Sequence, residues 1–176
     1  MSTPAFTVGV LSSSVCSMSL TPQPVYFDTI DTPIGEMILI SDGEFVTGVR
    51  PHTGSLAHGV RDPEVLAEAI SQLRAYFAGE LTKFELPTCQ PGTTFQRLVW
   101  GELTKIPYGE TISYAELARR VQNPSASRAV GSANGRNTLG VIVPCHRVIA
   151  SDGTLGGYGW GLSRKQWLLD HERGSR

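Results

Sequence analysis

The pattern of apolar and polar residues divides the chain into a strand-rich first half and a helix-rich second half. Residues 25–50, VYFDTIDTPIGEMILISDGEFVTGVR, alternate short β-prone runs with the turn sequences TPIG and SDGE. This pattern predicts two or three antiparallel strands joined by hairpins. Asp62 as an N-cap, Pro63 at the first helical position and Gly79 at the end predict a helix next. Its apolar stripe, which should cover one face of the sheet, contains Val65, Leu66, Ala69, Ile70, Leu73 and Phe77.

The second half reads as several short helices. Residues 80–92, ELTKFELPTCQPG, predict a linker because two prolines and a glycine interrupt regular structure. A helix follows, ended by Pro107 and Gly109, whose apolar positions are Phe95, Leu98, Val99 and Leu103.

Two further short helices are predicted on either side of a tight turn. Ser113 and Glu116 form a capping box that begins one, and Asn123 with Pro124 marks the turn before a helix of small residues that ends near Gly135. This arrangement is typical of a helix-turn-helix, although the signal is not specific when taken alone. The last predicted helix has Ser163 as its N-cap, with Gln166 completing a capping box and Leu162 packing on Trp167.

Composition and charge change this picture only in part. With 40% apolar and 18% charged residues, the 176-residue chain can bury a core, and no apolar run approaches the roughly 20 residues of a membrane span. Residues 1–24 are interpreted as a poorly ordered extension rather than a targeting signal. Residues 1–91 contain 4 Lys/Arg and 10 Asp/Glu, a net charge of −6. Residues 92–176 contain 11 Lys/Arg and 6 Asp/Glu, a net charge of +5. A polyanionic partner should therefore meet the second half.

Cys145 is the candidate nucleophile. Three cysteines without paired spacing argue against a disulfide framework and favour a reducing, cytoplasmic compartment. Cys145 alone has titratable neighbours, His146 and Arg147, in the apolar run VIVPCHRVIA. A free thiol needs a base or a positive environment to react at neutral pH. In an extended segment neighbouring side chains point apart, so His146 would act through a water unless the chain turns here. A buried structural cysteine beside a surface histidine is the alternative.

Six blocks of sequence decide between these alternatives. In order they are FQRLVW, IPYGETISYAELA, RAVGSANGRN, VPCHRVI, GYGWGLSRKQWLL and a final Glu172. With these blocks, residues 93–172 resemble the O6-alkylguanine-DNA alkyltransferases, and residues 25–91 resemble them with fewer motifs. The resemblance implies an α/β N-terminal lobe, ribonuclease H-like, with a small antiparallel sheet and a helix over residues 25–91. It also implies a mainly α, winged-helix-like lobe over residues 92–176 that contains the helix-turn-helix.

The resemblance implies a stoichiometric repair reaction. The alkyl group of O6-alkylguanine in DNA, and of O4-alkylthymine, would pass to Cys145 in a single turnover. By the family pattern Glu172 orients His146, His146 works through water to form the Cys145 thiolate, and Asn137 braces the segment that holds them. A carboxylate fixes the imidazole tautomer and stabilises the imidazolium that forms. Without the family, Glu172 would be interpreted as a solvated charge at a helix end.

The resemblance also implies how the base reaches the thiol. The target nucleotide must leave the duplex, and in this family a residue at the position of Arg128 replaces it while Tyr114 helps to eject it. Small residues let the helix approach the minor groove, and the expected DNA contacts include Ala129, Gly131 and Ser132. The expected base pocket is formed by Tyr114, Val148, Tyr158, Gly159 and Trp160.

Two residues depart from many relatives. Trp160 stands where a small residue is common, and we expect it to narrow the pocket and favour methyl over benzyl groups. Thr138 stands where proline is common, which leaves the stiffness of that loop open.

No metal or other cofactor is expected, because the four histidines and three cysteines lack zinc-site spacing. The expected partner is double-stranded DNA, bound by a monomer, with cooperative binding along DNA left open. A non-catalytic alkyltransferase-like DNA-damage binder is the main alternative, and such proteins lack the reactive cysteine. A cysteine hydrolase would use Cys145 and His146, but it leaves Arg128 and the basic second half unexplained.

Overall fold

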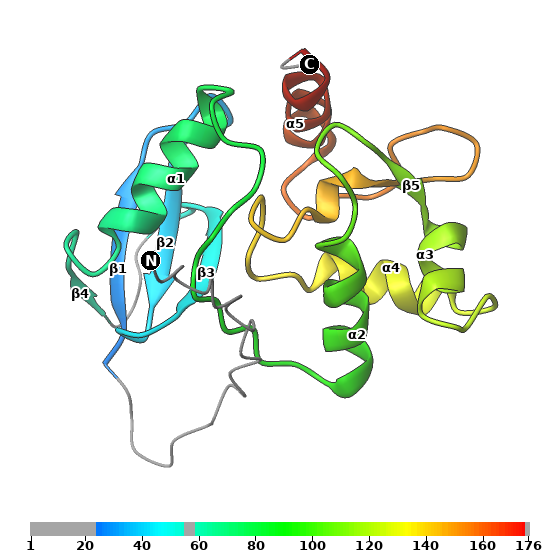
Figure 1. Ribbon diagram of the computed structural model, residues 1–176, viewed down its shortest axis with the longest axis horizontal. Helices are drawn as coiled ribbons and strands as arrows, with labels where there is room; N and C mark the ends of the chain where they lie inside the picture. Colours follow the sequence, from blue (N-terminus) through cyan, green and yellow to red (C-terminus); the bar gives the residue numbers. More distant parts are fainter. Residues whose placement is uncertain (1–23, 55–58, 175–176) are drawn as a thin grey trace, which may run out of the picture.

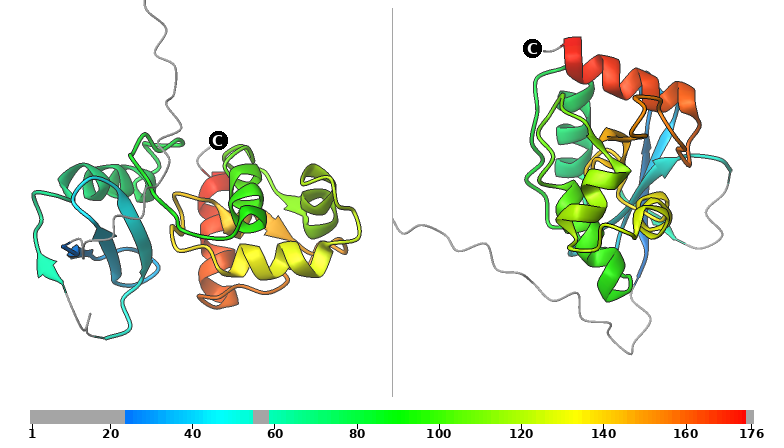
Figure 2. Two further views of the ribbon diagram at one scale, coloured as in Figure 1. Left: turned by 90° about the horizontal axis from the view of Figure 1, so that it is seen from below. Right: turned by 90° about the vertical axis from the view of Figure 1, so that its right-hand side faces the viewer.

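The computed structural model describes residues 24–54 and 59–174, so the expected N-terminal extension lies outside them, apart from Pro24. A sheet-containing half is followed by a helical half, and the two lie side by side (Figures 1 and 2). The first contains β1 (Tyr26–Ile30), β2 (Met37–Ser41), β3 (Val46–Pro51), β4 (Val60–Arg61) and α1 (Ala67–Phe77). The second contains α2 (Thr94–Leu103), β5 (Ile112–Ser113), α3 (Tyr114–Arg120), α4 (Ser127–Gly135), the 3-10 turn η1 (Cys145–Arg147), β6 (Val148–Ile149) and α5 (Leu162–Gly174).

The first three strands form the predicted antiparallel hairpins. Tight turns join them because their polar side chains bond back to the backbone: Asp42 Oδ1 accepts from the amides of Glu44 (3.0 Å) and Phe45 (2.7 Å). Gly43, between them, has a φ of +100°, which a residue with a side chain rarely adopts. The pattern of short apolar runs and turns therefore predicted this part of the fold correctly.

The sheet has a fourth strand that was not predicted, and it makes the sheet mixed rather than purely antiparallel. The strand order is β3-β2-β1-β4, and β4 pairs with β1 in parallel. Because β4 has only two residues, both exposed, it has no apolar alternation from which it could have been recognised. The opposite edge strand, β3, faces the helical half (Figure 1).

Helix α1 covers one face of the sheet, as expected, but it begins later than predicted. Asp62 caps a turn instead, since its Oδ1 accepts from the amides of Glu64 and Val65, and Val65 is 39% exposed. Regular helix starts at Ala67 and ends before Gly79. Its buried residues are Ala69, Ile70, Leu73 and Tyr76, and Leu66 is buried just before it.

Capping in the helical half agrees only partly with the prediction. Ser113 caps α3 by accepting from the Glu116 amide, but the Glu116 carboxylate binds Arg119 and Arg120 instead of completing the box. A complete capping box, which was not predicted, forms at α2 between Thr93 and Gln96. The other helix starts and the apolar face of α2 also differ in detail from the prediction.

Helix α5 starts at Leu162, so Ser163 is not its N-cap, and Gln166 donates to Asp170 within the helix. Leu162 is 50% exposed. In α2, Val99 and Leu103 are buried as predicted together with Trp100, whereas Leu98 is exposed.

Helices α3 and α4 pack together across a tight turn, which is the predicted helix-turn-helix. In the turn, the amide of Asn123 donates to the carbonyl of Ala118, and Gln122 has a φ of +57°. Strands β5 and β6 pair in parallel, with Ile112 opposite Val148. This pairing brings the start of α3 next to the end of η1, although more than 30 residues separate them in the sequence.

Cys89 is buried. Cys145 is the free cysteine of the described part of the chain.

Candidate active site

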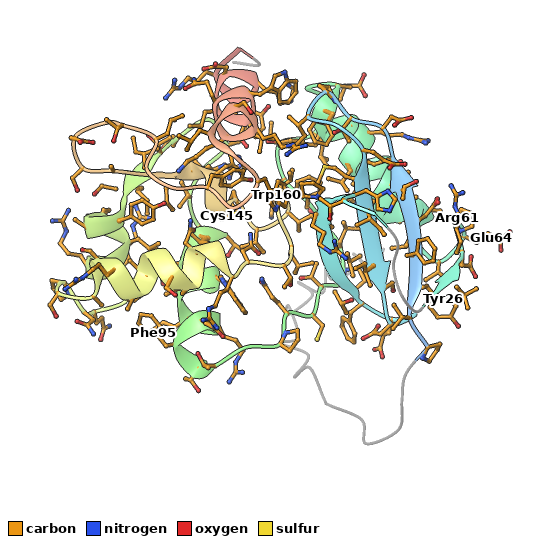
Figure 3. All side chains as sticks on the ribbon, turned by 180° about the vertical axis from the view of Figure 1, so that it is seen from behind. Tyr26, Arg61, Glu64, Phe95, Cys145 and Trp160 are labelled. Atoms are coloured by element: carbon orange, nitrogen blue, oxygen red, sulfur yellow. The ribbon has the colours of Figure 1, made fainter. Side chains whose placement is uncertain are left out.

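The site is a cavity of about 550 Å³ in the helical half, and Cys145 lies on its wall. Helix α3 contributes Tyr114, and α4 contributes Arg128 and Gly131. The loop before α5 closes the cavity on the other side. In Figure 3, Cys145 and Trp160 lie near each other, where the helical half meets the sheet. The remaining residues of the lining are Ser127, Asn134, Gly135, Asn137, Gly157, Tyr158 and Gly159.

Cys145 belongs to a single 3-10 turn and not to an extended segment. The amide of Arg147 donates to the carbonyl of Pro144 at 3.0 Å, and Cys145, His146 and Arg147 are all buried. The turn sends successive side chains in different directions, so Cys145 lines the cavity while His146 and Arg147 reach α5. The rule that neighbouring side chains of a strand point apart therefore does not apply here.

Glu172 of α5 is completely buried and accepts hydrogen bonds on both oxygens. Oε1 accepts from His146 Nε2 (2.8 Å), Arg147 Nη2 (2.9 Å) and the Tyr76 hydroxyl (2.8 Å). Oε2 accepts from Arg147 Nε (2.9 Å) and the Gly109 amide (2.9 Å). Burial alone would raise the pKa of Glu172, but the bonds from His146 and Arg147 hold it well below its usual range. The carboxylate is therefore ionised.

His146 is held in one orientation by this carboxylate. Burial lowers the pKa of His146 below its ordinary value, although Glu172 acts in the opposite direction, so the ring is neutral at rest. Its Nδ1 atom is buried and has no hydrogen-bond partner among the described residues. Since Nε2 is bonded to Glu172, Nδ1 is the nitrogen that can accept a proton.

The thiol of Cys145 has groups beside it that favour its charged form. Burial raises the pKa of Cys145, while the side chains of Asn137 and Tyr158 and the charge of Lys165 lower it. Lys165 is also buried, and its Nζ donates to the carbonyls of Val148 (2.6 Å) and Leu155. Burial lowers the pKa of Lys165 to about 8, against the pull of the Cys145 charge. The resting thiol is protonated, and a negative charge formed on it would be stabilised.

The face of α4 beside the cavity is exposed and lined by small residues. Arg128, Ala129 and Ser132 are exposed, and Gly131 lines the cavity next to the ring of Tyr114. The hydroxyl of Tyr114 donates to the carbonyl of Gly157 at 3.3 Å. A cavity with the Cys145 thiol on its wall thus lies beside a helix face that another molecule can approach closely.

Comparison with known proteins decides the family. The 6-O-methylguanine DNA methyltransferase, DNA binding domain, matches residues 94–174, and the ribonuclease-like domain of the same family matches residues 25–89. The chain belongs to the 6-O-methylguanine DNA methyltransferase family. The methylated-DNA-protein-cysteine methyltransferase of Mycobacterium bovis is 47% identical over 153 residues, 85% of this chain and 93% of that protein. The constitutive enzyme of Bacillus subtilis is 42% identical over 159 residues, 84% and 95% of the two chains.

Solved structures agree with the family match. The crystal structure of the Mycobacterium tuberculosis O6-methylguanine methyltransferase superposes with a TM-score of 0.81 at 46% identity, covering 86% of this chain and 94% of that one. A structure of the Mycobacterium tuberculosis protein in complex with DNA also gives 0.81, at 48% identity, covering 85% and 94%. The two-domain fold of the methyltransferase family, a sheet domain followed by a helical DNA-binding domain, is therefore present here.

Most residues expected at the methyltransferase site lie together. Cys145, Asn137, Tyr114, Arg128, Gly131, Tyr158, Gly159 and Trp160 all line the cavity. Ala129 and Ser132 are on the exposed face of α4 outside it. Val148, expected in the base pocket, is fully buried and does not line the cavity, and its carbonyl accepts from Lys165.

The two unusual residues of this methyltransferase are both anchored. A Cβ atom on Gly140 would lie 1.9 Å from the Trp160 ring, so the indole packs directly against the Gly140 backbone. Trp160 is therefore part of the cavity wall. Thr138 donates from Oγ1 to the carbonyl of Thr47 (3.2 Å), and its own carbonyl accepts from the Val49 amide (2.8 Å). Bonds to β3 thus hold the loop that proline stiffens in many relatives.

Sequence reasoning predicted Glu172 but missed Lys165, Tyr76 and Gln90. The buried residues of α5 are Lys165, Leu168, Leu169 and Glu172, at positions i, i+3, i+4 and i+7. Two charged residues within an apolar stripe were a readable signal that both are buried. Tyr76 and Gln90 come from distant parts of the chain, and no local pattern marked them. Within the described residues, no group of three or more His, Cys, Asp or Glu side chains could hold a metal ion.

Proposed function

We propose that this protein repairs DNA by transferring the alkyl group of O6-alkylguanine to Cys145 in a single turnover. The observation that supports it is the position of Cys145 on the wall of a base-sized cavity, with His146 and the ionised Glu172 behind it and α4 beside it. O4-alkylthymine is a proposed second substrate. The proposed partner is double-stranded DNA, which is supported by the structure of the Mycobacterium tuberculosis protein in complex with DNA.

Each of the site residues has a separate role in alkyl transfer. The Cys145 thiol gives its proton to His146 Nδ1, directly or through one water, and Glu172 stabilises the resulting imidazolium. The thiolate attacks the alkyl carbon, so a C–S bond forms while the C–O6 bond breaks and its electron pair leaves with guanine, which takes up a proton. Asn137 and Tyr158 stabilise the thiolate until it reacts. Because the thioether product is stable, each molecule acts once.

The helix-turn-helix binds the DNA so that the target base can enter the cavity. Helix α4 approaches the minor groove through Ala129, Gly131 and Ser132, and Arg128 at its start fills the space that the extruded nucleotide leaves. Tyr114 contacts the base from the cavity wall. The net charge of +5 on residues 92–176 supports contacts with phosphates, so binding weakens as salt rises.

Other features of the protein belong to the same proposal. Residues 25–91 form the α/β domain with its linker, and residues 92–176 form the domain that binds DNA and contains the site. The protein acts as a monomer in the cytoplasm, where its DNA substrate is found. No helix of the described residues has both the length and the apolar character that crossing a membrane requires.

The main competing function is a binder of damaged DNA that performs no chemistry. Cys145 favours transfer, because a binder has no use for a thiol surrounded by hydrogen-bond donors. Mass spectrometry after incubation with an O6-methylguanine duplex tests this. We expect one methyl group on the peptide that contains Cys145, none with unmodified duplex, and none in Cys145→Ala. Unmodified protein that still binds the lesion would support the binder, and repeated release of methylated product would support a hydrolase.

A further inference from the structure

The edge of β3 holds two segments that are distant in the sequence. Val46 pairs with Thr88 of the linker, and Val49 pairs with Leu139 of the segment before Cys145, both in parallel. The amides of Val46 and Val49 donate to the carbonyls of Pro87 (2.9 Å) and Thr138 (2.8 Å). One strand of the first domain therefore aligns the linker with the segment that leads into the active site.

Gln90 and Asn137 meet where these two segments come together. Gln90 follows the paired part of the linker, and Asn137 precedes the paired part of the other segment. Gln90 Nε2 donates to Asn137 Oδ1 at 2.8 Å, and the Leu139 amide donates to the same oxygen at 3.0 Å. Both acceptor positions of that oxygen are therefore occupied.

These two bonds fix which way the Asn137 amide faces. Its Nδ2 donates to the carbonyl of Val143 at 2.7 Å, which also accepts from the Cys145 amide at 2.8 Å. Asn137 and Cys145 line the same cavity, and Asn137 lowers the pKa of the Cys145 thiol. If the amide were reversed, its oxygen would face the carbonyl oxygen of Val143, and its nitrogen would face two donors. Such an arrangement leaves part-buried polar groups without partners, which is unfavourable.

We propose that Gln90 is a positioning residue for alkyl transfer, which keeps the amino group of Asn137 directed at Cys145. The linker from the first domain is then a working part of the active site. This inference rests on the proposed function insofar as Cys145 accepts the alkyl group. Asn137 remains the residue that lines the cavity with Cys145, and Gln90 acts through it.

The test measures how fast Cys145 reacts as a function of pH. Folded full-length protein is treated with iodoacetamide between pH 5 and 10, and modification of the Cys145 peptide is followed by mass spectrometry. In Gln90→Leu we expect the midpoint of the profile to move to higher pH, because the thiolate loses a well-directed donor. The other groups that face Cys145, namely Tyr114, His146, Tyr158 and Lys165, are unchanged. With O6-methylguanine duplex at neutral pH, transfer should slow about tenfold, the effect of losing one hydrogen bond to a charged group.

Two further variants separate positioning from simple packing. Gln90→Glu keeps the size of the side chain but replaces its donor by a carboxylate oxygen that repels Asn137 Oδ1, so its profile should move at least as far as that of Gln90→Leu. Gln72→Leu is the matched control. Gln72 also braces the linker, since its amide donates to and accepts from the backbone of Glu85, but it does not touch Asn137. Its loss should leave the profile in place.

The outcomes are distinct. In Asn137→Ala, adding Gln90→Leu should change nothing further, because Gln90 acts only through Asn137. Unchanged profiles in both Gln90 variants, or an equal shift in Gln72→Leu, would overturn the inference. A shifted iodoacetamide profile in a protein that takes no methyl group from DNA would support the positioning role while refuting the proposed function.

Discussion

The two halves of the molecule bury different kinds of side chains. Among the described residues, the sheet half buries two polar or charged residues, Asp28 and Ser41, together with the hydroxyl of Tyr76. The helical half buries Asn134, His146, Arg147, Lys165 and Glu172. Apolar side chains in a core stabilise a fold without needing specific partners, whereas buried charges stabilise it only if every one is paired. The first half therefore contributes mainly to stability, whereas the second half contains the buried charged groups of the reaction, which lower stability when they are not paired.

The largest expected effect comes from Glu172→Gln. The variant leaves Arg147 buried without its counter-charge and weakens the hold on His146, so we expect a loss of about 3–5 kcal/mol in the free energy of unfolding and the loss of methyl transfer. Urea unfolding and a single-turnover assay measure the two. Asp170→Asn, on the same helix but exposed, is the control and should cost less than about 1 kcal/mol. A stable, active Glu172→Gln would contradict this account of the helical half.

A core substitution in the sheet half should affect stability alone. Leu39→Ala removes a fully buried side chain from the middle strand of the hairpins, and we expect it to cost about 2–5 kcal/mol. Because Leu39 lies on β2 and does not line the cavity, the rate of methyl transfer per folded molecule should equal that of the unchanged protein. The rate is measured on the fraction that remains folded at low temperature. A slower rate in that fraction would mean that the two halves are not separable in this way.

The buried charges also predict how stability depends on pH. The pKa of His146 is lowered by burial, so the unfolded chain binds a proton below about pH 6.5 while the folded protein does not, and stability falls as pH drops through that value. The pKa of Glu172 is also lowered in the fold, so its contribution is present above about pH 4.3 and is lost at lower pH. Urea unfolding at several pH values measures this. The dependence between pH 7.5 and 5.5 should be weaker in His146→Leu, and an identical dependence would exclude His146 as its source.

The smallest expected effect comes from replacing Trp160, which lies where the two halves meet. Its ring lies against Gly140 and near Tyr158, on the wall of a cavity of about 550 Å³, which suggests a role other than the expected narrowing of the pocket. An aromatic wall favours an aromatic substituent by stacking. Trp160→Gly should therefore slow transfer from O6-benzylguanine duplex several-fold more than transfer from O6-methylguanine duplex, whereas Trp167→Leu, outside the cavity, should not. A relative gain for the benzyl group would support the narrow pocket instead.

Much of the fold was readable because it is local. Turns such as Asp42–Gly43 and the cap at Ser113 need only neighbouring residues, and the hairpins and helix-turn-helix were predicted from them. The start of α1 was predicted too early because Asp62 and Pro63 fit a turn as well as a helix. Strand β4 is too short for any periodic signal.

The candidate site also contains residues that the sequence predicted and contacts that it could not predict. The sequence motifs predicted Cys145, His146, Glu172 and Asn137 as site residues, and the fold brings these residues together. They could not show that Tyr76 and Gly109 also bind Glu172, nor that Gln90 holds Asn137. Those contacts join residues 47 to 96 positions apart, and no pattern along a chain records which side chains meet at such separations.

By itself the sequence determined which chemistry is present: a thiol, an imidazole and a carboxylate in motifs whose order indicates the family. The tertiary structure decided how they work. A 3-10 turn directs Cys145 into a cavity and His146 toward α5, and five hydrogen-bond donors keep Glu172 ionised in the interior. The physical reason is that burial changes the energy of every charge, and burial exists only once distant segments have packed together.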